Sequence, residues 1–91
     1  MRRIVWSLIA EKKRAAALEY IAADSVKAAL GQLAEIDRQV DLLIDQPHMG
    51  RPGRIQGTRE LVIRHTPFIV VYRVAAERVQ ILRFLHGAEN R

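Results

Sequence analysis

Apolar residues follow two different periods along the chain, and this divides it into a helical part and an extended part. Between residues 9 and 44 they recur every three or four positions, the spacing of one helix face. A first helix is predicted at about 9–22 and a second from residue 26. The clearest apolar stripe belongs to the second helix and consists of Val26, Ala29, Leu33, Ile36, Val40, Leu43 and Ile44. Only residues 23–25, which include the capping pair Asp24-Ser25, separate the helices, so an antiparallel hairpin is expected.

Extended segments lie on both sides of the predicted hairpin. Residues 4–6 are β-branched and aromatic and predict a first strand. Three more strands are predicted at 59–65, 68–74 and 78–85. Their short connections require antiparallel neighbours. Residues 48–57, rich in glycine and proline, form the only loop of any length, and the polar residues 86–91 predict an exposed tail.

The predicted order of elements is β-α-α-β-β-β, in a single domain over residues 1–91. A helical hairpin with one apolar stripe has to bury that stripe, and the sheet is its only available partner. We therefore expect an α+β fold in which an N-terminal helical hairpin packs on a mainly antiparallel four-stranded sheet. The first strand is expected to rejoin the sheet beside a later strand.

The net charge of +5 is distributed unevenly. Residues 1–45 carry seven basic and seven acidic side chains, whereas residues 46–91 carry eight arginines against three acidic residues. Arginine presents a planar fork of donors that suits phosphates and carboxylates, so the second half is predicted to meet an anion. Any one of these arginines could instead be a solvated charge at the edge of the sheet. The candidate binding residues are Arg51, Arg54, Arg59, Arg64 and Arg83.

Several classes of protein and site are not expected. The chain has no cysteine, and its three histidines are spread over 39 positions, so neither a disulfide framework nor a metal site is predicted. No cofactor is implied. No apolar run approaches the roughly 18 residues needed to span a bilayer, and a cytoplasmic location is expected. No helix gathers basic residues on one face, so sequence-specific DNA reading by this chain alone is not expected.

Five phrases of the sequence are recognisable as a set. They are YIAAD at 20–24, PHMGRPG at 47–53, GTRELV at 57–62, IVVYRV at 69–74 and VQILRFLHG at 79–87. With the predicted order of elements, the chain resembles over nearly its whole length the RelE/ParE superfamily of type II toxins, also known as plasmid stabilisation proteins.

The resemblance implies a growth-inhibiting toxin with particular partners. Such toxins are made with an antitoxin that wraps and neutralises them, and the pair commonly represses its own operon. ParE-like members act on DNA gyrase and block replication. RelE-like members are mRNA interferases, which enter the ribosomal A site and cut messenger RNA. The implied partners are a cognate antitoxin and either gyrase or the ribosome with its mRNA.

If the chain were an RNase, it would need a base, cations on the phosphate and an acid for the leaving oxygen. The resemblance implies His86, Arg64 and Arg83 for these roles. His86 ends the last strand, where histidine-using relatives carry catalytic side chains, and Arg64 aligns with a phosphate-binding arginine of the RelE type. The lysines that RelE uses have no counterpart here. The leucine–histidine phrase also occurs in ParE-like members without nuclease activity.

Other polar residues of the second half are expected to be structural. Tyr72 lies in a very apolar strand and is predicted to belong to the core. Glu60 is expected to pair with a neighbouring arginine, and His48 and His65 to sit in solvent. The residues therefore form no convincing acid–base set.

The long amphipathic hairpin and the loop at 47–53 favour a gyrase-directed poison over a ribosome-dependent RNase. A third interpretation is an inactive toxin that serves only as an antitoxin-binding corepressor. Arg14 is compatible with that interpretation, because relatives usually carry leucine there, although its stem can cover apolar surface. The antitoxin is expected to lie along the hairpin and to add to a sheet edge. Neutralising Arg59, Arg64 and Arg83 together is expected to weaken antitoxin binding.

Overall fold

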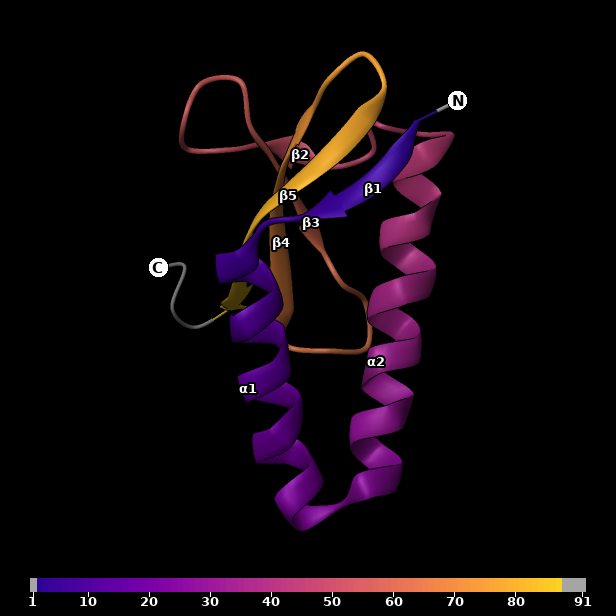
Figure 1. Cartoon of the computed structure of the whole chain (residues 1–91), viewed down its shortest axis with the longest axis vertical. Coiled ribbons are helices and arrows are strands. Elements are labelled where there is room, and N and C mark those ends of the chain that lie inside the picture. The colour runs from indigo at the N-terminus through magenta and orange to yellow at the C-terminus, as the bar shows by residue number, and fades with distance from the viewer. Residues whose placement is uncertain (1, 88–91) are drawn as a thin grey trace.

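Two helices cover one face of a twisted sheet (Figure 1). The computed structural model describes residues 2–87. The elements are β1 (Arg3–Trp6), α1 (Leu8–Asp24), α2 (Val26–Asp41), the short 3-10 helix η1 (Leu42–Ile44), β2 (Arg51–Pro52), β3 (Arg59–Val62), β4 (Phe68–Val74) and β5 (Arg78–His86). Among these, neither α-helix combines the length and the hydropathy needed to cross a membrane. The α+β class and the predicted order are confirmed.

The sheet has five strands, one more than predicted, in the order β1-β5-β4-β3-β2. β1 runs parallel to β5, and the other pairs are antiparallel. The additional strand is β2, whose two residues pair with β3 inside the predicted long loop. A two-residue strand that contains Pro52 has no readable period, which is why the sequence pattern did not predict it.

Two predicted strand ends were wrong. β3 ends at Val62 and not at residue 65, because the chain turns there and His65 adopts a φ of 69°. β5 continues through His86, which pairs with Phe68, so His86 does not belong to a tail. Residues 88–91 of the predicted tail lie outside the described residues.

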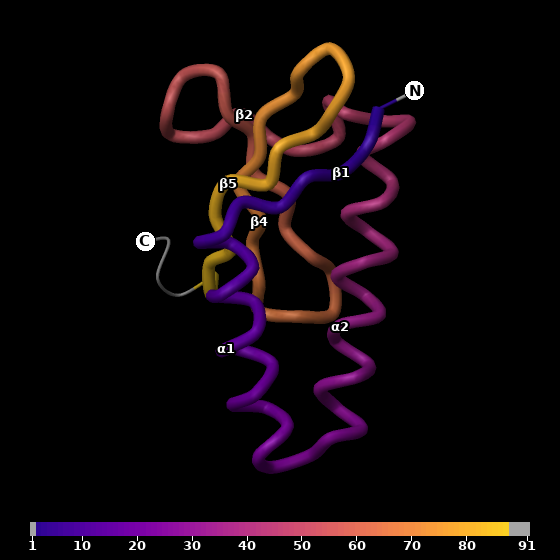
Figure 2. The backbone as a smooth tube through the Cα atoms, viewed as in Figure 1, coloured from indigo at the N-terminus to yellow at the C-terminus, as the bar shows by residue number. Residues whose placement is uncertain are grey.

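The helical hairpin forms as predicted, and a serine caps each helix. The Ser7 hydroxyl accepts a hydrogen bond from the Ala10 amide at 3.0 Å, and the Ser25 hydroxyl accepts one from the Ala28 amide at 3.1 Å. Each serine satisfies an amide that has no partner within its helix. Figure 2 shows the two helices running in opposite directions, with their connection projecting beyond the sheet.

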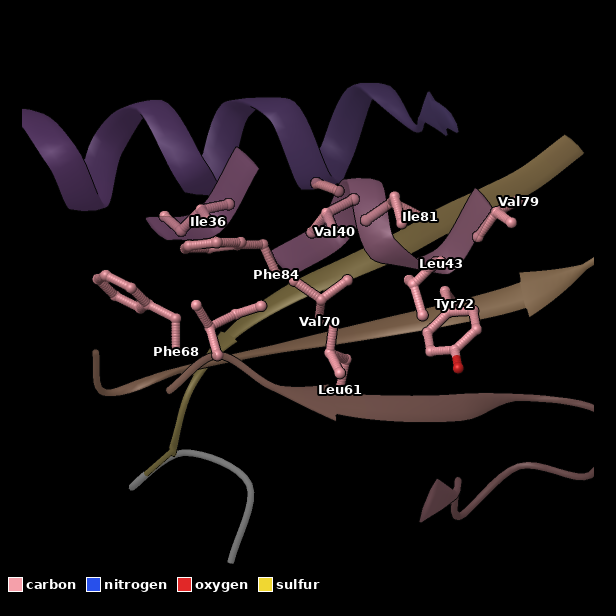
Figure 3. Close-up of a cluster of buried hydrophobic side chains, with 12 residues drawn as sticks. Ile36, Val40, Leu43, Leu61, Phe68, Val70, Tyr72, Val79, Ile81 and Phe84 are labelled. Carbon is pink, nitrogen blue, oxygen red and sulfur yellow. The ribbon is translucent and has the colours of Figure 1, made fainter. Parts of the chain in front are cut away.

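The core lies between the hairpin and the sheet (Figure 3). Its helical side contains the predicted stripe residues Ile36, Val40 and Leu43, which are at most 1% exposed. Its sheet side is formed by Leu61, Ile63, Phe68, Val70, Tyr72, Val79, Ile81 and Phe84. The stripe is not buried along its whole length, since Val26 is 63% exposed. Val26 is the first residue of α2 and so lies at the connection between the helices. The sheet does not reach this connection (Figure 1).

Candidate functional site

The face of the sheet that points away from the helices carries a group of arginines. Side chains alternate between the two faces of a strand, so the buried residues fix which side each neighbour takes. Residues paired across strands share a face, and this assigns five exposed arginines to the side opposite the core. We call this surface the open face; its arginines are Arg3, Arg51, Arg73, Arg78 and Arg83.

One cross-strand row on the open face joins two of the predicted binding residues. Arg51 pairs with Glu60, Glu60 with Val71, and Val71 with Arg83. The Arg51 guanidinium donates to Glu60 Oε1 from Nη2 at 2.9 Å and from Nε at 3.2 Å. The side chain of Glu60 is only 7% exposed, so its charge lies beneath the arginine. The predicted pairing of Glu60 with an arginine is confirmed.

Arg59 points to the other side of β3 and holds the start of the loop. Its Nη1 donates to the carbonyl oxygen of Gly50 at 2.8 Å and to that of His48 at 3.4 Å. The buried Tyr72 hydroxyl donates to the Pro47 carbonyl at 2.7 Å and accepts from the Gly50 amide at 2.9 Å. Burial raises the pKa of Tyr72, although the Gly50 amide and the nearby Arg59 charge partly oppose that rise. Tyr72 is thus a core residue, as predicted, whose hydroxyl anchors the loop.

Gly50 is required by this anchor. A Cβ at Gly50 would come within 2.8 Å of both the Tyr72 ring and the Glu60 carbonyl oxygen. Any side chain would therefore push the loop away from β3 and β4. The exposed part of the loop, with Arg54 and the 73% exposed Ile55, follows this anchor.

His86 faces the helix side of the sheet, at the end of a groove. The groove has a volume of about 380 Å³ and is lined mainly by apolar and small residues of α1, β4 and β5. His86 is exposed and lies edge-on to Phe68, with ring centroids 6.0 Å apart. Because Arg83 lies on the open face, the structure does not bring His86 and Arg83 together. His48 and His65 are exposed, at the loop and in the β3–β4 turn, as predicted.

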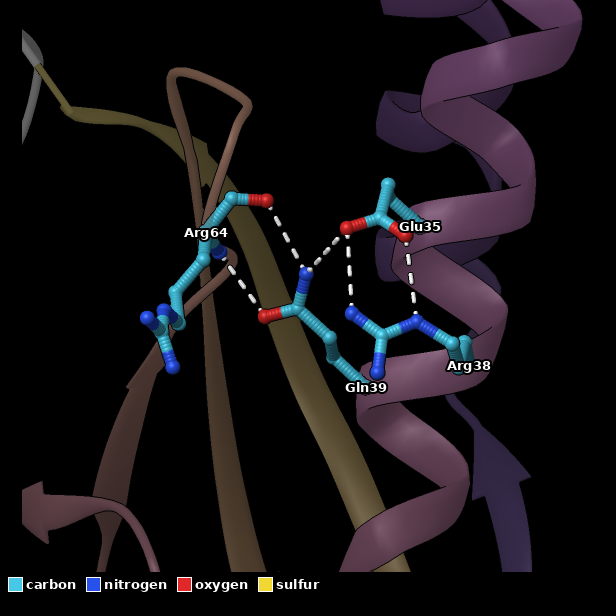
Figure 4. Close-up of polar contacts among 4 residues, drawn as sticks. All are labelled: Glu35, Arg38, Gln39 and Arg64. Carbon is cyan, nitrogen blue, oxygen red and sulfur yellow. Dashed lines mark hydrogen bonds and ion pairs between the residues drawn. The ribbon is translucent and has the colours of Figure 1, made fainter.

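Arg64 lies in the turn between β3 and β4, which a buried glutamine ties to α2 (Figure 4). The Gln39 side chain accepts from the Arg64 amide at 2.8 Å and donates to the Arg64 carbonyl oxygen at 2.9 Å. It also donates to Glu35, which forms two hydrogen bonds of 3.1 Å with Arg38. Hydrogen bonding by Arg38 lowers the pKa of Glu35. The guanidinium of Arg64 points away from this network and is exposed (Figure 4).

The roles of Gln39 and Trp6 are not evident from the sequence pattern. Gln39 is 4% exposed and precedes the stripe residue Val40 on the helix. A polar residue beside an apolar stripe is the signal in the sequence that could have identified it, because a buried polar group needs a hydrogen-bond partner. The sequence pattern predicts only that Trp6 belongs to the first strand. In the structure its ring contacts Arg14, the residue that interrupts the apolar pattern of the first helix.

Known proteins resemble the chain in both sequence and structure. The family model for the ParE toxin of the type II toxin–antitoxin system parDE matches residues 4–91. The candidate toxin Y4kP of Sinorhizobium fredii is 41% identical over 89 residues, which cover 98% of this chain and 92% of Y4kP.

Two solved structures illustrate the similarity in fold. A structure of the chromosomal ParDE TA system from P. aeruginosa matches with a TM-score of 0.82 and 28% identity, covering 94% of this chain and 96% of that one. YafQ from E. coli strain BL21(DE3) matches with a TM-score of 0.60 and 17% identity, covering 98% of this chain and 97% of YafQ. At this identity the likeness concerns the fold alone. The chain therefore belongs to the ParE toxins of type II toxin–antitoxin systems, within the RelE/ParE superfamily.

Proposed function

We propose that this toxin is a poison of DNA gyrase that performs no chemistry of its own. The observation that carries the proposal is the separation of His86 and Arg83 on opposite faces of β5. An RNase needs its acid or base within hydrogen-bond reach of the atoms that its cations hold. Arg59, a further candidate cation, is bound to loop carbonyls. A protein that acts by binding needs only an exposed surface of suitable charge and shape.

The similarity to ParE supports the same target. The match to the ParDE structure has the higher TM-score and identity, and YafQ is a more distant neighbour. ParE-like toxins are the members of the superfamily that act on gyrase, as the sequence resemblance implied.

A cognate antitoxin is the second partner that we propose. One of the structural neighbours is a ParDE TA system and another is a DinJ–YafQ complex. The groove between α1 and the sheet offers an apolar surface to an amphipathic segment. β2 pairs with only two residues of β3, so Leu61 and Val62 have no strand partner on that side. An extended segment of the antitoxin could pair with this exposed part of the sheet edge. Exposed Arg64 and Arg83 provide charge for an acidic antitoxin.

Expression without the antitoxin tests the target. We expect growth to stop, with early loss of DNA synthesis in labelled-precursor incorporation and induction of the SOS response. Early loss of protein synthesis together with codon-phased mRNA cleavage would instead establish the RNase. Normal growth with soluble, folded protein would establish the inactive corepressor.

His86→Ala separates chemistry from binding. A gyrase poison should keep its effect on DNA supercoiling within a few-fold, because it requires no acid or base from His86. An RNase that uses His86 should lose at least about 100-fold in cleavage rate. His48→Ala, at another exposed histidine, serves as the matched control.

A further inference from the structure

The open face also carries a group of positive charges, whichever of gyrase and the ribosome is the target. Four of its arginines, Arg3, Arg73, Arg78 and Arg83, have no carboxylate partner in any ion pair among residues 2–87. Glu60 is the only acidic residue on the strands of the described chain, and it lies beneath Arg51. The face therefore carries its excess positive charge on three adjacent strands, β1, β5 and β4.

The size of this surface suits a polymer of negative charges. Neighbouring strands lie about 4.8 Å apart, so the three adjacent strands that carry these arginines extend about 10 Å across. Duplex DNA carries one negative charge per about 1.7 Å of its axis, which gives about six phosphates over that distance. Arginine can form two parallel hydrogen bonds to a phosphate. Arg73 donates one hydrogen bond to Gln80 and Arg83 donates one to the Leu82 carbonyl, and each guanidinium keeps further donors for a phosphate.

The distribution of aromatic residues distinguishes a duplex from a single strand. Proteins that bind single-stranded nucleic acid stack its bases on aromatic side chains. The chain has five aromatic residues, and none lies on the open face. Trp6, Phe68, Tyr72 and Phe84 face the helix side, and Tyr20 belongs to α1. The open face thus provides contacts to a sugar–phosphate backbone without a platform for bases.

We propose that the open face of the sheet binds the phosphate backbone of duplex DNA without sequence preference. The contacts come from Arg3, Arg73, Arg78 and Arg83. Within residues 2–87 no helix lies on this face to enter a groove, so the surface holds a duplex without reading its bases.

Fluorescence anisotropy of the purified chain with a labelled 20-base-pair duplex tests the proposal. Four phosphate contacts predict that the logarithm of affinity falls with the logarithm of salt with a slope of roughly −3 to −4. Affinity should then drop about 100-fold between 50 and 200 mM salt. A single-stranded RNA of the same length should bind no more tightly. Absence of duplex binding at 50 mM salt, or a clear preference for the RNA, would overturn the proposal.

A pair of variants with equal charge change locates the site. The triple variant R73Q/R78Q/R83Q removes three charges from the open face and should reduce the slope to about −1, with at least a tenfold loss of affinity at 50 mM salt. The control K12Q/K13Q/K27Q removes three charges from exposed positions on the helices and should keep the slope and stay within about threefold in affinity. Equal losses in both variants would mean attraction by net charge alone and would refute a specific face.

Chemical protection of the unmodified chain gives an answer that does not depend on how the variants fold. Bound duplex should shield Arg78 and Arg83 from an arginine-modifying dicarbonyl, measured by mass spectrometry. Lys12 and Lys27 should stay equally reactive toward an acetylating reagent with and without DNA. Protection of the lysines with the arginines left reactive would place DNA on the helices and would refute the proposal.

Discussion

The guanidinium carbon of Arg14 lies 4.0 Å from the centroid of the Trp6 ring. The same guanidinium lies 3.7 Å from Asp37 on α2, and the Arg14 side chain is only 23% exposed. Arg14 therefore joins β1, α1 and α2 through one group. The residue that breaks the apolar pattern of the first helix is a packing contact in its own right, because its stem is covered and its charge meets both a ring face and a carboxylate.

Removing this contact should weaken the fold. Arg14→Ala is expected to lower the free energy of unfolding by about 1 kcal/mol, since a partly buried cation–π pair is lost together with the packing of the stem. A double-mutant cycle with Trp6→Leu, followed by urea denaturation, measures the coupling. Lys13→Ala, at the neighbouring exposed position, should change stability little. A coupling near zero would show that the ring and the guanidinium do not interact.

Gln39 should contribute more to the free energy of unfolding than the adjacent ion pair between Glu35 and Arg38. Gln39→Leu leaves the amide and the carbonyl of Arg64 without their helix partner, and we expect a loss of about 1–3 kcal/mol. Arg38→Ala removes only an exposed pair with Glu35 and should cost less than about 0.5 kcal/mol. Thermal and urea unfolding of both variants test this order, and equal losses would contradict it.

The hydroxyl of Tyr72 should hold the loop in place. Tyr72→Phe keeps the buried ring but leaves the Gly50 amide unpaired, which is expected to cost about 1–3 kcal/mol. Hydrogen exchange at the Gly50 amide should become faster. Tyr20→Phe, at a position that is 84% exposed, is the control and should leave both quantities unchanged. Unchanged exchange in Tyr72→Phe would mean that the loop does not depend on this bond.

The stability of the fold should decline at alkaline pH because of Tyr72. Its folded pKa is raised above the ordinary value of 10.0, mainly by burial, so between the two values the folded chain binds more protons than the unfolded chain. The stabilising contribution is complete below the ordinary pKa and is lost as pH rises through the folded pKa. Denaturation between pH 8 and 11 measures the decline, and Tyr72→Phe should reduce it. An equal decline in the variant would assign the effect to other groups.

Antitoxin binding should depend on the exposed arginines of the second half. Arg59 holds loop carbonyls, so neutralising it also disturbs the loop. The variant R64Q/R83Q avoids this and is expected to weaken binding about tenfold at low salt, mainly through a slower association rate. K12Q/K27Q carries the same charge change on the helices. Surface-plasmon kinetics at two salt concentrations distinguish the variants, and unchanged association in R64Q/R83Q would remove the electrostatic part of the proposal.

The periodicity of the sequence by itself determined much of this protein. A spacing of three to four residues required the hairpin, short connections required antiparallel strands, and a single apolar stripe required burial against the sheet. These features depend on local sequence, so they can be read along the chain. The arginine excess and the family resemblance likewise needed no structure.

Only the tertiary structure decided which side chains share a surface. In a regular strand Arg83 would lie on the helix side with Val79 and Ile81, because side chains alternate with period two. The register shifts between Val71 and Tyr72, which leaves Leu82 as an extra residue in β5. That one-residue bulge turns Arg83 to the open face and His86 to the groove. The pairing of β2 and the bonds of Gln39 depend in the same way on contacts between residues distant in sequence, which no local pattern encodes.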